Sequence, residues 1–328
     1  MDLNNYYAVP PENYLQGEKE KKEIKYIGRV AGCCILGYIL LQNLLFTLVY
    51  ISPFGSLYYS DPTFESVVNI FLSIFSMLIP FGIGGYLIGK RTKTNVFNFE
   101  KPVSTPLMLS AVPLGFFICL IGNYITSLFV YAMEDMGFTL TAPEYSVPSD
   151  TVGRIVYAFA IAVVPALVEE FAIRGAILQP LRKYGDKFAI IASAFVFAIL
   201  HGNLIQAPFA LIAGIGIGYA VCITGSIWTG VLIHFCNNLY SVLTEFMIED
   251  IANEAVLEEV YTTVMVTLYI VSVLGSILFV VLKGRRKLIP SFTALPAKRK
   301  ALAFVITVPM IIALIFIFKI TKEFVSFG

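Results

Sequence analysis

Two adjacent carboxylates and an arginine lie in the middle of an apolar stretch of the chain. Glu169, Glu170 and Arg174 interrupt residues 152–180, which are otherwise hydrophobic enough to cross a lipid bilayer. A charged side chain near the bilayer centre costs roughly 2.5–3.5 kcal/mol on insertion scales, so such residues normally face a protein interior or a wet cavity. Residues of these types at this depth indicate catalysis or transport.

The two acids are expected to have different roles. Arg174 follows Glu170 by four residues, the spacing at which opposite charges meet on one helix face. Glu169 points about 100° away from Glu170 around the helix axis. We therefore predict that Glu170 and Arg174 form a structural ion pair at the site and that Glu169 faces other groups.

The two histidines of the chain lie at a depth similar to that of Glu169. His201 ends the apolar stretch 187–204, roughly 20 Å from Lys187 at its start, and His234 lies in the stretch 226–246, roughly 12–15 Å from its start near Ser226, at 1.5 Å per residue. Asn238 follows His234 by four residues and shares its helix face. Three helices are therefore expected to bring Glu169, His201, His234 and Asn238 together.

These side chains are the ones that hydrolysis of an amide bond requires. A carboxylate can accept the proton of the attacking water, and an asparagine amide or a histidine ring N–H can stabilise the developing oxyanion. No serine or cysteine completes a nucleophilic set with them. A proton-coupled transporter is the alternative, because intramembrane Glu, His and Arg also build proton relays. The polar groups, however, concentrate in one half of the chain and follow no inverted repeat.

The composition predicts an all-α membrane protein with many spans. Of the residues, 58% are hydrophobic and 14% are charged, whereas a soluble domain has about 25% charged residues. A bundle of eight to nine transmembrane helices is expected, from nine apolar stretches of about 20 residues: 27–51, 64–89, 104–132, 152–180, 187–204, 206–224, 226–246, 260–282 and 301–318. Within the sixth, Gly214-x-x-x-Gly218 predicts close helix packing.

The basic residues predict the orientation of the spans. Nineteen of the 23 Lys and Arg residues fall in the N-terminal tail or in the connections around 90–101, 182–187 and 283–300. The alternate connections, 52–63, 133–151 and 247–259, contain none. By the positive-inside rule the N-terminus of this multi-pass protein is expected on the cytoplasmic side of the cell membrane. Nine spans would then place the C-terminus outside.

Three elements of the sequence together resemble the signature of a known protease family. Glu169-Glu170-x-x-x-Arg174, Phe197-x-x-x-His201 and His234-x-x-x-Asn238 occur in this order on successive apolar stretches. They resemble the CPBP family of intramembrane proteases, which includes the type II CAAX prenyl proteases (Rce1-like) and bacteriocin-processing enzymes. The resemblance covers about residues 150 to 247.

The resemblance implies a helix bundle around a water-filled cavity that opens to the cytoplasm. It also implies that Glu169 and His201 activate the water, that His234 and Asn238 stabilise the oxyanion, and that the substrate is a membrane-associated or lipidated peptide or protein. A family member without proteolytic activity, acting as a membrane scaffold, is a further alternative. We expect the lipid bilayer and this substrate as partners and no nucleic acid; the sequence does not specify an oligomeric state.

No cofactor is expected. The alternative is a zinc site formed by Glu169, His201 and His234 with one open position. Each of these ligands comes from a different helix, and the chain has no HExxH-like pair that would fix two of them. Metal-free catalysis is therefore favoured.

The chain divides into four parts by composition. Residues 1–25 are polar and charged and are expected to form a disordered cytoplasmic tail. Residues 26–149 are expected to be supporting transmembrane helices, 150–247 the catalytic helices, and 248–328 the C-terminal transmembrane helices.

Overall fold

Long helices make up nearly all of the structure, a computed structural model that describes residues 12–97 and 99–327. Seven helical segments are long and apolar enough to cross a membrane, or eight if the bent pair near the C-terminus counts as one span. The predicted all-α bundle of a multi-pass membrane protein is confirmed. The helices before the site are α1 (Glu12–Ile51), α2 (Gly55–Ser60), α3 (Pro62–Thr92) and α4 (Thr105–Asp135).

The predicted catalytic helix is continuous in space but changes its winding along its length. It consists of α5 (Thr151–Ala158), the π-helix η1 (Phe159–Val163), α6 (Val164–Glu170), the π-helix η2 (Phe171–Leu178), α7 (Gln179–Leu181) and the 3-10 turn η3 (Arg182–Tyr184). π-helical turns within α-helices occur frequently at functional sites. Glu169 and Glu170 lie at the boundary between α6 and η2.

The remaining helices and two short strands complete the chain. They are α8 (Asp186–Leu200), α9 (Gln206–Thr224), α10 (Ile227–Asp250), α11 (Glu254–Lys283), α12 (Ala297–Val305), α13 (Val308–Glu323), β1 (Phe138–Leu140) and β2 (Val325–Phe327). Side chains cap several helix starts. Asp61 and Asn253 each accept from two main-chain N–H groups, at the start of α3 and of α11, and Asp150 accepts from the N–H of Gly153 in α5.

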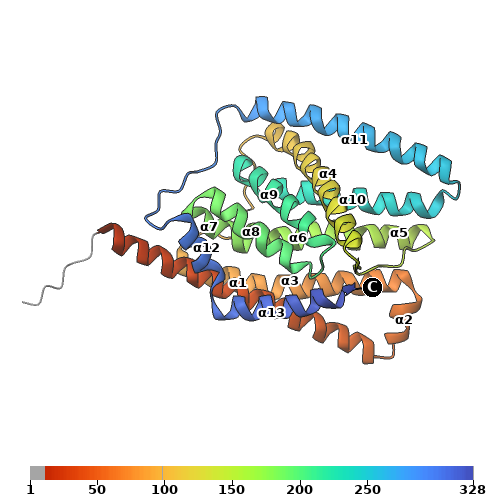
Figure 1. Cartoon of the computed structure of the whole chain (residues 1–328), viewed down its shortest axis with the longest axis horizontal. Coiled ribbons are helices and arrows are strands. Elements are labelled where there is room, and N and C mark those ends of the chain that lie inside the picture. Colours follow the sequence, from red (N-terminus) through yellow and green to blue (C-terminus); the bar gives the residue numbers. More distant parts are fainter. Residues whose placement is uncertain (1–11, 98, 328) are drawn as a thin grey trace, which may run out of the picture.

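The helices that surround the site form a ring. Helix α1 packs on α3, α3 on α5 and α6, η1 and α6 on α10, α10 on α4, α4 on α9, and α9 on α8, while α13 packs on α1. Gly32 allows the last of these contacts, because a Cβ there would overlap the main chain of Met310, and Gly28 allows α12 to approach α1 at Phe304 in the same way. Helix α11 lies outside the ring against α4 (Figure 1).

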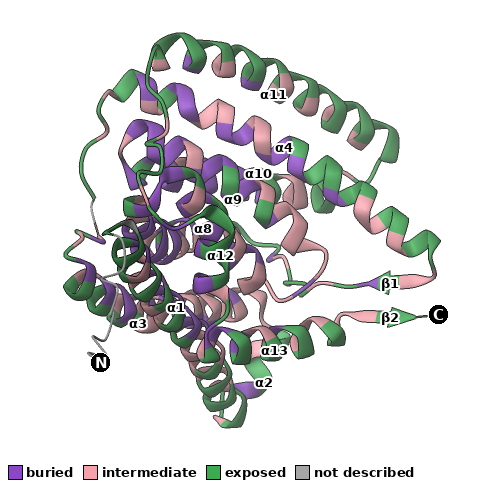
Figure 2. Cartoon of the chain, turned by 60° about the vertical axis from the view of Figure 1, so that its left-hand side comes forward, coloured by how far each residue is buried: buried purple, intermediate pink, exposed green. Residues whose placement is uncertain are grey.

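Burial follows this arrangement. Buried residues concentrate on α8, α9 and α10 and on the inner faces of their neighbours, whereas α11 is exposed along most of its length (Figure 2). Only Ser272 and Phe279 of α11 are buried among the described residues. Its exposed side chains are largely apolar, which suits a helix that contacts lipid.

The connections with basic residues gather at one end of the bundle, which we call the basic end. Lys183 Nζ lies 2.7 Å from Glu23 Oε2, joining the turn after α7 to α1. Lys300 Nζ donates to the carbonyl of Tyr184 at 2.8 Å, joining α12 to the same turn. In Figure 1 this end lies on the left, where α7 and α12 meet.

The connections without basic residues gather at the opposite end. Strands β1 and β2 pair antiparallel there, with Thr139 opposite Ser326, so the described C-terminal residues lie on the same side as the 133–151 connection. Ser146 N donates to Glu65 of α3 at 3.3 Å. Successive connections therefore lie at alternate ends of the bundle, in the order that the basic residues predict.

Two of the nine predicted spans differ from simple crossings. Helix α8 has 15 residues, about 22 Å at 1.5 Å per residue, whereas the hydrocarbon core is about 30 Å thick. It forms a hairpin with α9: Asp186 N bonds to Ile289 O, and Val103 N bonds to Thr224 O, so both ends of the hairpin lie at the basic end. The stretch 301–318 is broken into α12 and α13, which are bent by 72°.

Residues 12–25 correct one prediction. They were expected to be part of a disordered tail but form the first turns of α1. Glu20 accepts a hydrogen bond of 2.9 Å from the N–H of Leu295, and Ile24 is fully buried. Contacts with the C-terminal part of the chain thus stabilise this charged helix. The composition of residues 12–25 alone could not predict these contacts. Residues 1–11 of the predicted tail lie outside the described residues.

Candidate active site

A cavity of about 1560 Å³ enters the ring of helices from the end opposite the basic residues. Glu169, His201, His234 and Asn238 all line it, as the sequence predicts for side chains of one site. The outer part, which we call the mouth, is lined by the exposed or half-buried residues Glu134, Glu144, Glu245 and Glu249. The lining extends from these residues to apolar side chains deep in the bundle, such as Ile217.

The predicted ion pair is present beside the cavity. Arg174 Nη1 lies 2.8 Å from Glu170 Oε1, and both side chains are 0% exposed. Arg174 also donates to the carbonyl of Gly214 at 3.3 Å, and its guanidinium lies 4.9 Å from the ring centre of Phe197. The pair thus joins the catalytic helix to α8 and α9. Neither of its charges lines the cavity.

Gly214 serves this arrangement in two ways. A Cβ at Gly214 would lie 3.1 Å from Ala194 of α8, and one at Gly218 would lie 3.3 Å from Ile190. The Gly214-x-x-x-Gly218 run therefore packs closely against α8, as predicted. The close approach also holds the Gly214 carbonyl where Arg174 reaches it.

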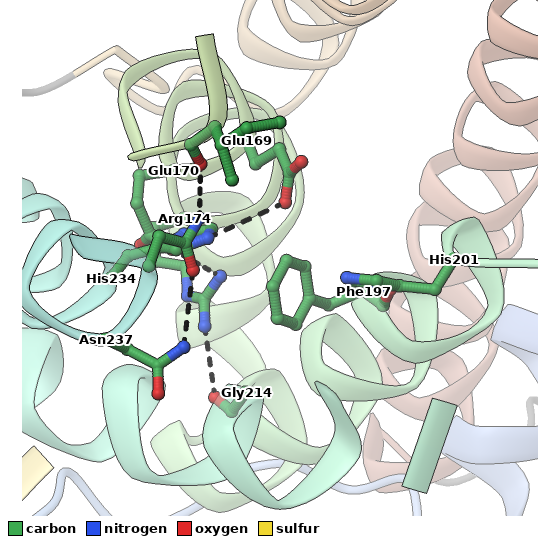
Figure 3. Close-up of polar contacts among 10 residues, drawn as sticks. Glu169, Glu170, Arg174, Phe197, His201, Gly214, His234 and Asn237 are labelled. Carbon is green, nitrogen blue, oxygen red and sulfur yellow. Dashed lines mark hydrogen bonds and ion pairs between the residues drawn. The ribbon is translucent and has the colours of Figure 1, made fainter. Parts of the chain in front are cut away.

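His234 lies between the two acids. Its Nδ1 is 3.2 Å from Glu170 Oε1, and its Nε2 is 4.0 Å from Glu169 Oε2 (Figure 3). The contact with Glu170 was not predicted, because the sequence assigned Glu170 to Arg174 alone. Glu170 instead connects the arginine to the histidine. A buried carboxylate that accepts from Nδ1 fixes the orientation of the ring and presents Nε2 to the cavity.

Glu169 differs from its neighbour in exposure. The Glu169 side chain is 23% exposed, whereas that of Glu170 is 0% exposed. Among the described residues, Glu169 makes no hydrogen bond, and its nearest charged partner is His234 at 4.0 Å. The 100° rotation between adjacent helical residues explains the difference. Glu169 is the carboxylate at the base of the cavity that a water molecule can reach.

Asn238 is held by the main chain of the catalytic helix. Its Nδ2 donates to the carbonyl of Ile161 at 3.0 Å, and its Oδ1 accepts from Asn237 Nδ2 at 3.2 Å. In an α-helix the N–H of residue 165 would bond to the carbonyl of Ile161, but Pro165 has no N–H. The second Nδ2 hydrogen of Asn238 remains for another acceptor.

A comparison with known protein families identifies this segment. Residues 151–240 match the family model described as Type II CAAX prenyl endopeptidase Rce1-like. These residues belong to the Rce1-like family. The match contains all six predicted site residues. No curated protein and no solved structure gave a significant match to the chain.

In the Rce1-like segment, His201 occupies the opposite wall of the cavity from His234. Its Nδ1 lies 2.9 Å from the carbonyl of Phe197, and its ring packs edge-on against the Phe197 ring at 4.9 Å. Gly202, with a φ of 65°, ends α8 directly after it. In Figure 3 the Phe197 ring lies between His201 on one side and Arg174 and His234 on the other. His201 and Glu169 thus share the cavity without a hydrogen bond between them.

Two residues of the Rce1-like site were not predicted to act there. Phe197 contacts the rings of both histidines, lying 5.7 Å from that of His234, and it also covers Arg174. Asn237, 7% exposed, orients the amide of Asn238. A signal existed for Phe197, since it precedes His201 by one helical turn in the motif. For Asn237 the only signal was its position beside Asn238.

The described side chains do not gather into a metal site. Among them, no group of three or more His, Cys, Asp or Glu residues is placed to hold a metal ion. Glu169 and His234 approach each other to 4.0 Å, but His201 lies across the cavity. Among the described residues, the three candidate zinc ligands therefore do not converge on one point.

The position of the cavity mouth bears on two expectations about orientation. The resemblance implies a cavity open to the cytoplasm, while the basic residues place the cytoplasm at the basic end. The mouth lies at the opposite end, beside the connection that contains Glu144. The two expectations therefore exclude each other for this chain.

Proposed function

We propose that the protein is an intramembrane endopeptidase that hydrolyses a peptide bond near the end of a membrane-associated or lipidated peptide or protein. The match of residues 151–240 to the Rce1-like endopeptidases supports the reaction class. One structural observation supports the assignment of particular residues. Glu169 is partly exposed to the cavity beside His234, while the adjacent Glu170 is buried in an ion pair.

In this proposal Glu169 acts as the general base. The carboxylate accepts a proton from a water molecule whose oxygen attacks the carbonyl carbon of the substrate. His201, on the facing wall of the cavity, orients that water. Protonated Glu169 then gives its proton to the amide nitrogen as the C–N bond breaks, which leaves a carboxylic acid and an amine. A positioned general base typically contributes about 10²- to 10⁴-fold to the rate.

His234 and Asn238 are proposed to stabilise the oxyanion of the tetrahedral intermediate. They lie one turn apart on α10 and both line the cavity. Asn238 offers the Nδ2 hydrogen that Ile161 does not use. A His234 that donates from Nδ1 to Glu170 donates from Nε2 only when both ring nitrogens carry protons. Each such donor is typically worth about 3–4 kcal/mol in the transition state.

The decisive experiment compares the peptides of cells that express the wild-type chain or Glu169→Gln at equal levels. We expect peptides or new protein termini that occur only with the wild type. Incubation of the purified protein with a synthetic precursor in ¹⁸O-labelled water should then place the label in the new carboxyl group. Glu100→Gln, an exposed substitution outside the cavity, serves as the control.

Two results would contradict the proposal. Identical peptide sets for the wild type and Glu169→Gln would exclude proteolysis by this site. Proton-coupled solute uptake into vesicles that contain the wild type, lost in Glu169→Gln, would instead support the transporter.

A further inference from the structure

The charge of the cavity wall is of one sign. The charged residues that line it are Glu134, Glu144, Glu169, Glu245 and Glu249, with no Lys or Arg among the described lining residues. No ion pair joins the mouth glutamates to a described basic side chain. A cleft lined by one sign of charge within low-dielectric walls concentrates ligands of the opposite sign.

The basic residues near the mouth do not line the cavity. Arg154, at the start of the catalytic helix, binds both carboxylate oxygens of Asp250 at 2.6 and 2.7 Å and does not line the cavity. Lys319 and Lys322 are exposed on α13 and also do not line it. The glutamates of the cavity wall therefore remain available to interact with a positively charged ligand.

Uncharged polar side chains also line the cavity. Thr126 of α4 lines the cavity, is 8% exposed, and its hydroxyl has no hydrogen-bond partner among the described residues. Asn123 and Ser127, one turn or less away, also line the cavity. Groups of this kind can bind the main-chain amides of an extended peptide.

The mouth opens away from the basic end. Nineteen of the 23 Lys and Arg residues belong to the basic end or to the adjoining connections, whereas the wall of the cavity reaches the connection around Glu144 and the ends of α4 and α10. The positive-inside rule places the basic end in the cytoplasm. It therefore places the mouth on the outer face of the membrane.

We propose that the cavity admits a cationic peptide segment, rich in Lys or Arg, from the outer face of the membrane. This inference rests on the proposed function for its consequence, cleavage, but not for binding. It names the substrate class of the site: an exported or membrane-anchored peptide whose positive charges lie close to the bond that is cut.

Binding is tested with full-length Glu169→Gln protein in uncharged phosphatidylcholine nanodiscs, so that the peptide is not consumed. The probes are two dye-labelled peptides with the same apolar sequence and either lysines or glutamates at the same positions. The mouth variant adds Glu134→Gln, Glu144→Gln and Glu249→Gln. The control variant adds Glu254→Gln, Glu258→Gln and Glu259→Gln, which remove the same charge from exposed positions of α11 outside the cavity.

We expect the lysine peptide to bind at least about tenfold more tightly than the glutamate peptide. The difference should disappear in the mouth variant, persist in the control variant and shrink at high salt. Equal binding of the two peptides, or an unchanged preference in the mouth variant, would overturn the inference. Tight binding of the lysine peptide without cleavage by the wild type would refute the protease proposal alone.

The side of entry is tested with single added cysteines, scored as labelling above the parent protein by an impermeant thiol reagent. Glu144→Cys lies at the mouth and Phe292→Cys at the basic end, where Phe292 is 82% exposed. We expect Glu144→Cys to react on intact cells and Phe292→Cys only after permeabilisation. Both variants should react in detergent, which controls for folding. The reverse pattern on intact cells would overturn the proposed side of entry.

Discussion

The side-chain amide of Asn238 donates a hydrogen bond of 3.0 Å to the main-chain carbonyl of Ile161. This bond joins α10 to the π-helical turn of the catalytic helix, 77 residues earlier in the chain. The carbonyl is the one whose α-helical donor would be residue 165, where the chain has proline. Because Pro165 has no N–H, the carbonyl of Ile161 is available to the side-chain amide of Asn238, a proposed catalytic group.

Pro165→Ala should lower activity without lowering stability. The new N–H competes for the carbonyl of Ile161, so Asn238 loses its fixed orientation; a displacement of about 1 Å can cost about 10²-fold in rate. Removal of an internal proline should leave the melting temperature unchanged or raise it. Cleavage rates and thermal unfolding in detergent measure the two effects. Pro106→Ala, in the exposed first turn of α4, is the control, and wild-type turnover by Pro165→Ala would disprove this role for the proline.

Glu169→Gln and Glu170→Gln should separate catalysis from stability. The first removes a base that faces the cavity and keeps its shape, so turnover should fall by at least about 10²-fold with little change in melting temperature. The second breaks a pair that is 0% exposed and leaves Arg174 and His234 without their carboxylate. Loss of one partner from a buried ion pair costs about 3–5 kcal/mol. Opposite behaviour of the two variants would show that the roles of the acids are reversed.

Gly230→Ala should lower both stability and activity, because the added methyl group would displace the Glu170 side chain. Gly230 lies on α10 one turn before His234, and a Cβ there would overlap Glu170 Oε2. Overpacking of this kind typically costs about 1–3 kcal/mol, and displacement of Glu170 should also reduce turnover. Gly82→Ala is the matched control, since its Cβ would meet only Phe171 at 3.9 Å. A Gly230→Ala protein as stable and active as the control would contradict the described position of Glu170.

Removal of metal should leave the activity intact. The described carboxylate and imidazole groups form no set of three around one point, and His201 lies across the cavity from Glu169 and His234. Protein washed with a chelator should therefore keep its turnover and contain far less than one zinc per chain. About one zinc per chain, with activity lost on its removal and restored on its return, would establish the zinc alternative.

Local relationships in the site were predictable from the sequence, and long-range ones were not. The Glu170–Arg174 pair follows from four-residue spacing on one helix, and Glu169 follows from the rotation between neighbours. The contact between Glu170 and His234 depends on how two helices 64 residues apart are turned toward each other. The spacing of residues along the sequence does not reveal how far each helix is rotated about its axis. The same limit applies to Asn238 and Ile161.

The fold shows a similar division. Apolar stretches predicted the helices, because each span must satisfy its main chain internally. They predicted a short fifth stretch that ends at residue 204, whereas α8 ends at Leu200, before Gly202 with its φ of 65°. They also missed the ordered start of α1, which depends on Glu20 and Leu295 at distant positions in the chain.

The seam between α1 and α13 sets the order in which the cavity can form during synthesis. Every residue of the Rce1-like segment has left the ribosome before α13 has been made, yet the wall near His201 is completed by Ile317 and Ile320 of that helix. Gly28 and Gly32 of α1 pack against Phe304 of α12 and Met310 of α13, which are synthesised later still. A nascent chain therefore inserts its acids and histidines long before the chamber around them is closed, and a truncated chain ending at residue 300 would hold them in an open-sided bundle.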